Sequence, residues 1–190
     1  MNAQNIAFGS AYFIEADTDP TETHLLTILV DNQPGTLARV IGLFSARGYN
    51  IESLTVSETQ HEEHLSRITI VTRATPNVLN QIRHQLERIV PVHRVVDLTM
   101  RARELNTGEP IERELALVKV VSKGNERAEA LRIADAFHAK VIDATVDHFV
   151  FEITGKSSKI DQFVDIMHSL GLVELCRTGV SAMNRGPQGL

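Results

Sequence analysis

Residues 25–44 read LLTILVDNQPGTLARVIGLF, and the change of pattern within this stretch decides the fold. Residues 25–30 are almost all apolar and rich in β-forming types, which is typical of a strand buried on both faces. Asn32-Gln33-Pro34-Gly35 then interrupts the strand with turn-forming residues. From Thr36 onward the apolar residues recur at helical spacing. The sequence therefore predicts a strand, a glycine-containing turn and a helix in direct succession.

The segments that follow, up to residue 100, complete a unit of four strands and two helices. Gly48 is placed to end the first helix, and Pro76 to begin the second. Further strands are predicted at 51–56, 65–72 and 92–99. The polar residues 57–64, which include His61-Glu62-Glu63-His64, are expected to form the hairpin loop between two of them. The resulting order is βαββαβ.

The same order of elements then begins again. Residues 101–112 are polar and aperiodic and contain Gly108 and Pro110, so we expect a linker there. The second set is predicted as strands at 115–121, 141–146, 149–154 and 172–180, with helices that include residues 130–137 and 160–170. The fold class is therefore α+β, with two tandem βαββαβ ferredoxin-like domains at 24–100 and 113–183. Residues 1–23 are expected to be a flexible extension, and residues 184–190 a mobile tail.

Composition excludes several classes of protein. The chain has 190 residues, of which 43% are hydrophobic and 23% charged, an ordinary globular mixture. Its formal charge of −5 argues against a nucleic-acid binder, which needs a basic face. No apolar run approaches the length of a membrane span, and the acidic N-terminal segment is unlike a secretory signal. Cys176, the one cysteine, excludes an internal disulfide; we expect it to act as a small hydrophobe in a cytoplasmic protein.

No catalytic constellation is found in the sequence. His61-Glu62-Glu63-His64 places its histidines three apart in a predicted loop, whereas the zinc motif HExxH needs them four apart on a helix. Nucleophile-elbow, Walker and dinucleotide-binding motifs are absent from the sequence. RNA-recognition domains share the βαββαβ order and stack bases on aromatic strand residues. Phe149 and Phe151 offer a weak match to that pattern, but core packing explains them better.

The turn at Asn32–Gly35 is the candidate ligand site. A strand that ends in a glycine turn at a helix N-terminus leaves backbone N–H groups free, and these suit a small carboxylate. Asn32 adds a polar side chain, and Gly35 keeps the turn free of a Cβ atom. On physical grounds alone, a simple tight turn at Pro34-Gly35, with Asn32 as its hydrogen-bonding partner, explains the same residues better.

The sequence of this region resembles a known family. DNQPGTLARV at 31–40 and FSARGYNIESL at 44–54 closely resemble the ACT domain of the small, regulatory subunit of acetolactate synthase (acetohydroxyacid synthase). The resemblance extends over about residues 24–186. Its further blocks are LSRITI at 65–70, RELALVKV at 113–120, RTGV at 177–180 and Arg185-Gly186.

The resemblance implies a homodimer, formed edge to edge through the ACT domains, that binds a branched-chain amino acid, usually valine. One wall of that site is implied to be the first loop and the other to be the start of the second strand of the partner chain. The residues implied in this way are Asn32, Gly35, Thr36, Leu37, Asn50 and Ile51. Backbone N–H groups at 35–37 would hold the carboxylate, the two asparagines would meet the ammonium group, and Leu37 with Ile51 would contact the side chain.

The resemblance also implies that this chain holds no cofactor, metal or catalytic residue. Thiamine diphosphate, magnesium and FAD are expected in the large catalytic subunit, which the small subunit activates and makes sensitive to valine. Ser122-Lys123-Gly124-Asn125 replaces the loop in the second domain, which we expect to contact the large subunit or to dimerise. Two alternatives remain: a free-standing tandem-ACT sensor that regulates another enzyme or transcription, and an RNA-binding tandem.

Overall fold

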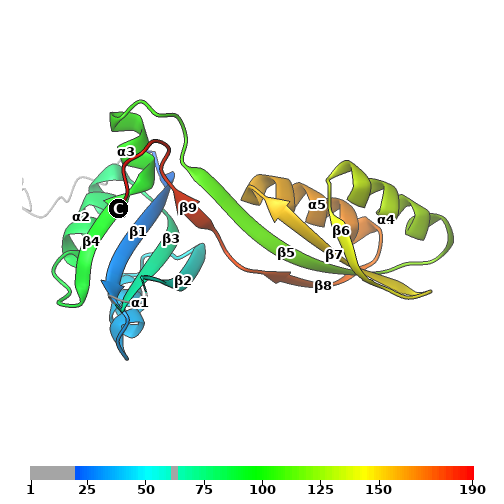
Figure 1. Cartoon of the computed structure of the whole chain (residues 1–190), viewed down its shortest axis with the longest axis horizontal. Helices are drawn as coiled ribbons and strands as arrows, with labels where there is room; N and C mark the ends of the chain where they lie inside the picture. The colour runs from blue at the N-terminus through cyan, green and yellow to red at the C-terminus, as the bar shows by residue number, and fades with distance from the viewer. Residues whose placement is uncertain (1–19, 61–63) are drawn as a thin grey trace, which may run out of the picture.

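The computed structural model describes residues 20–60 and 64–190, which form two units joined end to end (Figure 1). The elements of the first unit are β1 (Glu22–Asp31), α1 (Thr36–Ala46), β2 (Ser53–Gln60), β3 (Leu65–Ala74), α2 (Pro76–Leu86) and β4 (Val92–Asp97). Its antiparallel sheet has the strand order β2-β3-β1-β4. The predicted βαββαβ order is confirmed.

The central strand β1 is buried on both faces, as its continuous apolar run predicts. The five residues from His24 to Ile28 are all buried, although their side chains alternate between the faces. On one face Leu26, Ile28 and Val30 pack with residues of α1 and α2. The opposite face of this sheet therefore needs a cover of its own, and the chain supplies it from two later segments.

The first of these segments is a helix that the sequence analysis did not predict. α3 (Leu98–Glu104) lies where a strand end and the linker 101–112 were expected. Asp97 begins it as an N-cap, because its carboxylate accepts a hydrogen bond from the backbone N–H of Met100 at 3.0 Å. Leu98 and Ala102, four residues apart, are both buried. The prediction of an aperiodic linker over all of 101–112 was wrong because so short a helix shows only one apolar pair.

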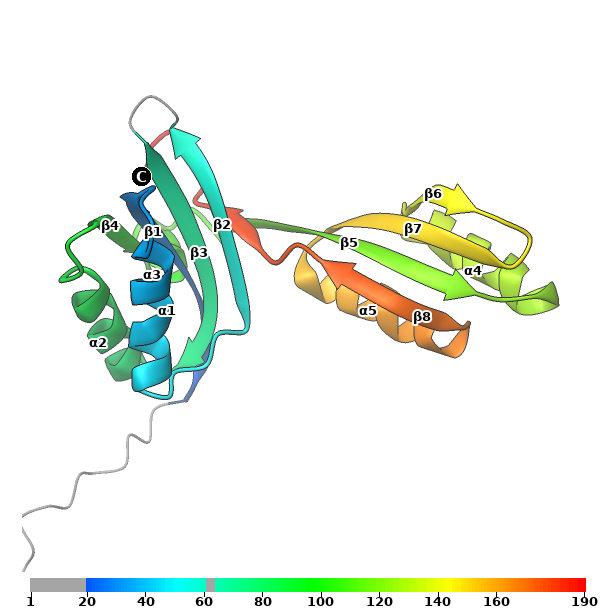
Figure 2. The same ribbon diagram turned by 90° about the horizontal axis from the view of Figure 1, so that it is seen from below.

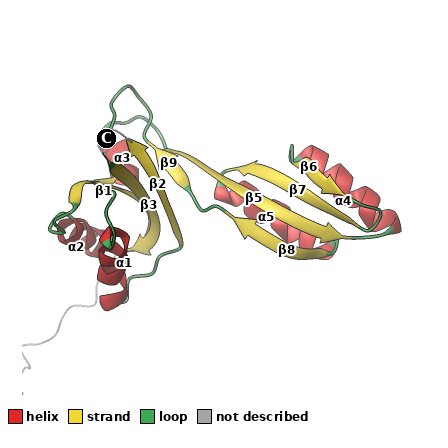
Figure 3. Ribbon diagram, turned by 60° about the horizontal axis from the view of Figure 1, so that its bottom comes forward, coloured by secondary structure: helices red, strands yellow, loops and turns green. Residues whose placement is uncertain are grey.

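The second unit repeats the topology of the first. Its elements are β5 (Ile111–Val121), α4 (Gly124–Ala136), β6 (Lys140–Ala144), β7 (His148–Gly155), α5 (Ser157–Ser169) and β8 (Leu172–Arg177). The strand order β6-β7-β5-β8 matches that of the first sheet position by position. In each unit the two crossover helices cover the same single face of the sheet (Figure 3).

Aromatic side chains fill the core of the second unit. Phe149 is 4% exposed and Phe151 is fully buried, and both pack with Phe163 of α5 and its neighbours. Because both phenylalanines are buried under helices, they cannot stack on bases. Core packing, the preferred interpretation of these two residues, is confirmed. Cys176 lies exposed on the edge strand β8, which does not fit its expected role as a small hydrophobe.

The second cover of the first sheet is the end of the chain. One strand was expected over 172–180, but β8 ends at Arg177, and Gly179 has a left-handed φ of 82° that turns the backbone. The chain then forms β9 (Ser181–Met183), which pairs with the start of β5 beside the first unit (Figure 2). Val180 and Ala182 are buried against Leu25 and Val71 on the face opposite α1 and α2.

Both ends of the chain differ from their expected description. β1 begins at Glu22, two residues inside the predicted extension 1–23, whose residues 1–19 lie outside the described part. His61, Glu62 and Glu63 of the predicted hairpin loop also lie outside it, and β2 extends to Gln60. In the predicted tail 184–190, Leu190 packs against the cluster that contains Val180.

We expect Phe151→Ala to lower the free energy of unfolding by about 3–5 kcal/mol, the usual cost of removing a buried phenylalanine side chain. The ring lies 5.4 Å from that of Phe149 and 6.1 Å from that of Phe163, so the cavity would open at the centre of the core. Urea denaturation followed by circular dichroism measures the change. Val146→Ala is the control, because Val146 is 86% exposed and should shift stability by no more than about 0.5 kcal/mol.

Candidate functional site

The predicted ligand loop lies between β1 and α1 and is held by the backbone. The N–H of Asn32 donates to the carbonyl of His64 at 2.7 Å, so the loop is anchored to the start of β3. The N–H of Thr36 donates to the carbonyl of Gln33 at 3.2 Å and closes the turn. Gly35 is the N-cap of α1 with φ of 86°, a conformation that favours glycine, and it supplies no side-chain cap.

The first turn of α1 presents unused hydrogen-bond donors. The N–H groups of Leu37 and Ala38 belong to the first turn, where a helix has no carbonyl partner, and within the described chain no cap bonds to them. A Cβ atom built on Gly35 would meet no other atom within 4 Å, so the space beside these donors is open. Of the donors predicted at residues 35–37 to hold a carboxylate, the N–H of Thr36 is used in the turn and that of Leu37 is open. Ala38 adds a further open donor that was not predicted.

Asn50 and Ile51 lie at the opposite end of α1. The carbonyl of Asn50 accepts a hydrogen bond from Thr72 Oγ1 at 2.6 Å, close to the start of β1. The 11 residues of α1 separate these two residues from the loop, which corresponds to about 16 Å of helix. Within one chain the structure therefore brings Asn32, Gly35, Thr36 and Leu37 together but leaves Asn50 and Ile51 apart from them.

The edge strand β2 connects the two halves of this divided site. β2 is bonded to β3 on one side, and no other described strand pairs with its outer edge. Leu37 and Val56 are large apolar side chains that remain exposed in this unit, at 36% and 42%. An unpaired edge flanked by exposed apolar side chains is a surface suited to pairing with another strand.

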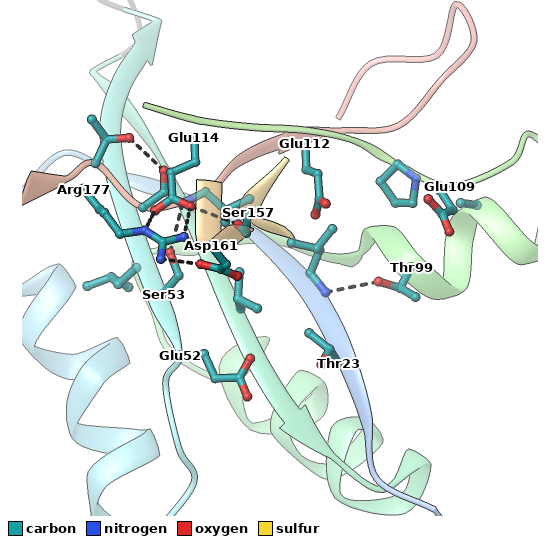
Figure 4. A pocket seen from close by; sticks show the side chains of 18 of the residues that line it. Thr23, Glu52, Ser53, Thr99, Glu109, Glu112, Glu114, Ser157, Asp161 and Arg177 are labelled. Carbon is teal, nitrogen blue, oxygen red and sulfur yellow. Dashed lines mark hydrogen bonds and ion pairs between the residues drawn. The ribbon is translucent and has the colours of Figure 1, made fainter. Parts of the chain in front are cut away.

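A second hollow lies between the two units and was not predicted. It is a cavity of about 1100 Å³ between the face of the first sheet opposite α1 and α2, α3 and the start of β5 (Figure 4). Carboxylates dominate its charged lining, with Glu52, Glu109, Glu112, Glu114 and Asp161 against Arg103 and Arg177. The resemblance blocks at 44–54, 113–120 and 177–180 each contribute residues to this lining, but nothing in the sequence indicated that they lie together.

A buried ion pair forms the side of this cavity that belongs to the second unit. Arg177 of β8 donates to both carboxylate oxygens of Glu114, at 2.8 and 2.6 Å, and to Asp161 of α5 at 2.6 Å. Ser157 adds a hydrogen bond to Glu114 at 3.0 Å. Burial by itself raises the pKa of Glu114, but the hydrogen bonds from Arg177 and Ser157 and the guanidinium charge together bring the pKa below its usual value. The same contacts raise the pKa of Arg177.

Two other kinds of site are not found among the described residues. Within 20–60 and 64–190, no three His, Cys, Asp or Glu side chains are grouped so that they could hold a metal ion. Across the same residues, no helix has the length and apolar character needed to cross a membrane.

Comparison with known proteins gives matches to both units. The model for the ACT domain of acetohydroxyacid synthase small-subunit-like proteins matches residues 26–94, and the model for the small subunit of acetolactate synthase matches residues 113–186. A probable acetolactate synthase small subunit of Archaeoglobus fulgidus is 40% identical over 86% of this chain and 97% of its own length. The small subunit of acetolactate synthase isozyme 3 of Salmonella typhimurium is 42% identical over 85% of this chain and 95% of its own.

A solved structure shares the whole architecture. The small subunit of acetolactate synthase from Thermotoga maritima superposes with a TM-score of 0.77 at 33% identity, over 88% of this chain and 99% of that one. The similarity therefore includes both units.

Glu114→Gln tests the ion pair beside the cavity. Because the folded-state pKa of Glu114 is lowered, its ionisation stabilises the fold above the unfolded-state pKa of about 4.3, and this contribution is lost as the pH falls through the folded-state pKa. We expect the variant to unfold with about 1–3 kcal/mol less free energy at neutral pH. The difference from the original protein should shrink as the pH is lowered below about 4.

Urea denaturation at a series of pH values measures this effect. Glu174→Gln is the matched control, since Glu174 pairs with Lys119 on the exposed surface of β8 and its removal should change stability little. A difference between Glu114→Gln and the original protein that stays constant down to pH 3 would contradict the assignment.

Proposed function

The chain belongs to the family of acetolactate synthase small subunits, and from this premise we propose that it activates the catalytic subunit and makes it sensitive to valine. Relatives of this name match nearly their whole length, which favours a regulatory subunit of this enzyme over a free-standing sensor that acts elsewhere. One observation supports the valine proposal most directly. The residues of the predicted site lie at the two ends of α1, as expected for a site that is completed by a second copy of the chain.

Pairing of two copies through β2 would reunite the halves of the site. In an antiparallel pair related by a two-fold axis, the start of β2 in one copy lies beside the end of β2 in the other. The ligand loop lies near the end of β2, because Asn32 is bonded to His64 just beyond the β2–β3 hairpin. Asn50 and Ile51, which precede β2, would then face the loop of the partner chain. Each dimer would hold two such sites.

The residues at this junction suit a branched-chain amino acid. The open N–H groups of Leu37 and Ala38, at the positive end of the α1 dipole, would receive the carboxylate. Asn32 and Asn50 are both exposed and carry amide oxygens that can accept from the ammonium group. The exposed side chain of Leu37 and the half-buried Ile51 would line the space for the aliphatic side chain.

Feedback follows from where such a ligand sits. A molecule bound between two copies changes how tightly they pair, and it favours whichever arrangement it binds more strongly. Couplings of this kind are typically about 1–3 kcal/mol. We propose that thiamine diphosphate, magnesium and FAD are held by the catalytic subunit, so that this chain acts on the reaction only through its contact with that subunit.

The second unit is proposed to contact the catalytic subunit or a second copy rather than valine. Its β5–α4 connection consists of Ser122 and Lys123 alone, whereas four residues connect β1 to α1. Lys123 is the N-cap residue of α4, where the first unit has Gly35, and its Nζ lies 3.2 Å from Asp147 Oδ1 in an ion pair.

L-Valine should raise the melting temperature of the purified chain, because it binds the native state. At a concentration 100-fold above the dissociation constant, the gain is about 2.7 kcal/mol. For a chain of this size the shift would be about 5–10 °C. A thermal-shift titration against L-valine, L-leucine and L-isoleucine measures it, with D-valine as the control. Equal shifts with the L and D enantiomers would contradict a built site.

Gly35→Asp should abolish inhibition by valine while the catalytic subunit is still activated. The new carboxylate would lie beside the donors of Leu37 and Ala38 and repel that of the ligand. Gly124→Asp is the matched control, because Gly124 also has positive φ and open space where its Cβ would be, but it lies in the second unit. Acetolactate formation by the reconstituted enzyme, with and without L-valine, measures both variants. Inhibition that survives in Gly35→Asp would contradict the site.

A further inference from the structure

The segment Thr178–Met183, which we call the strap, is hydrogen-bonded to both units. Toward the second unit, the N–H of Thr178 donates to the carbonyl of Leu115 at 3.0 Å, and β9 pairs with residues 111–113 of β5. Toward the first unit it crosses the face of the sheet opposite α1 and α2, where Val180 and Ala182 are buried. The other connection, at residues 105–110, is mostly exposed and contains no regular secondary structure.

On the first unit, the strap is held mainly by β2. Thr55 Oγ1 donates to the carbonyl of Val180 at 2.7 Å, and the N–H of Val180 donates to Ser53 Oγ at 2.9 Å. Two side chains of one strand thus take both polar groups of a single residue, as a neighbouring strand would. Val180 is only 5% exposed, so water cannot replace these bonds without displacement of the strap.

Gly179 permits this close approach. A Cβ atom at this position would lie 2.8 Å from Ser53 Oγ, 3.1 Å from Thr55 Oγ1 and 3.3 Å from the carbonyl oxygen of Leu54. Its φ of 82° also disfavours any other residue. The strap backbone therefore lies directly against the hydroxyl groups of Ser53 and Thr55, with no side chain of the strap between them, which makes the contact sensitive to small shifts of the strand.

A third contact fastens the strap to β3. The guanidinium of Arg67 donates to the carbonyl of Ala182 at 2.5 Å. Arg67 is partly buried by the segment that it holds, and this burial lowers its pKa. The strap thus joins β2 and β3 of the first sheet to β5 and β8 of the second.

β2 is also the strand that follows Asn50 and Ile51, with only Glu52 between them and Ser53. Any change in the position of β2 when the partner's loop and a ligand close on Asn50 and Ile51 must reach Ser53 and Thr55. We propose that the strap transmits effector binding from β2 to the second unit, with Ser53 and Thr55 as the positioning residues that couple the two. This inference rests on the proposed function, because it takes valine as the effector and the catalytic subunit as the readout.

Thr55→Val tests the inference with little change of shape. Valine has nearly the volume of threonine but cannot donate to Val180, whereas Thr55→Ser, the matched control, keeps the hydroxyl. Gly179→Ala breaks the same contact from the strap side. Each full-length variant is combined with the cognate catalytic subunit. The measurements are activation without valine, the valine concentration for half-maximal inhibition, and the dissociation constant of L-valine for the isolated variant by calorimetry.

Thr55→Val and Gly179→Ala are expected to bind L-valine as the original protein does and to activate the catalytic subunit. The concentration for half-maximal inhibition should rise at least about five-fold, the lower end of typical allosteric couplings. Thr55→Ser should behave like the original. Circular dichroism and thermal melting confirm that each variant is folded before it is scored, and if one variant does not fold, the other carries the test.

Unchanged inhibition by valine in both Thr55→Val and Gly179→Ala would overturn the inference. Loss of valine binding by the isolated variants would overturn it too, since the strap would then build the site rather than transmit from it. Failure of the proposed function looks different: the original protein itself would neither bind L-valine nor confer inhibition.

Discussion

Both faces of the first sheet must be buried, and this requirement shapes the remainder of the fold. β1 is buried without interruption from His24 to Ile28, and its two crossover helices cover only one face. Apolar side chains on the other face, such as Leu25 and Val71, can be buried only if another segment of the chain packs against them. The chain provides α3 and the strap, and the second of these comes from beyond the entire second unit. Burial of one face thereby ties the two halves of the chain together.

The second sheet is not subject to this constraint, and its strands show it. In β5 buried and partly exposed residues alternate, with Ala116, Val118 and Val120 on the helix side and Leu117 and Lys119 on the other. A sheet with one face turned outward is common among antiparallel folds. Equal topology therefore coexists with different surroundings. The first unit is enclosed on both faces, whereas no described residue covers one sheet face of the second unit or the outer edges of β6 and β8, which leaves them available for contact with other molecules.

The placement of the strap gives β2 two neighbours of different kinds. At its outer edge β2 is paired with no other described strand. On the sheet face opposite α1 and α2 it binds Val180 through Ser53 and Thr55. An edge strand that lies in the proposed ligand interface and also bears the link to the second unit can respond to one and act on the other. Packed cores and paired strands have few alternative arrangements, so a shift of such a strand is passed on rather than absorbed.

Most of the helices and strands, and the family, could be predicted from the sequence, because periodicity and turn chemistry act over a few residues. The run LLTILV predicted a strand buried on both faces, and Gly35 predicted the turn before α1, whose backbone conformation favours glycine. Tertiary packing was needed to form α3, to place Asn32 and Asn50 at opposite ends of α1, and to bring residues 178–183 against β2. The contact between Thr55 and Val180 joins residues 125 positions apart. No local pattern encodes it, since it arises from the burial of an apolar face that several distant segments could have covered.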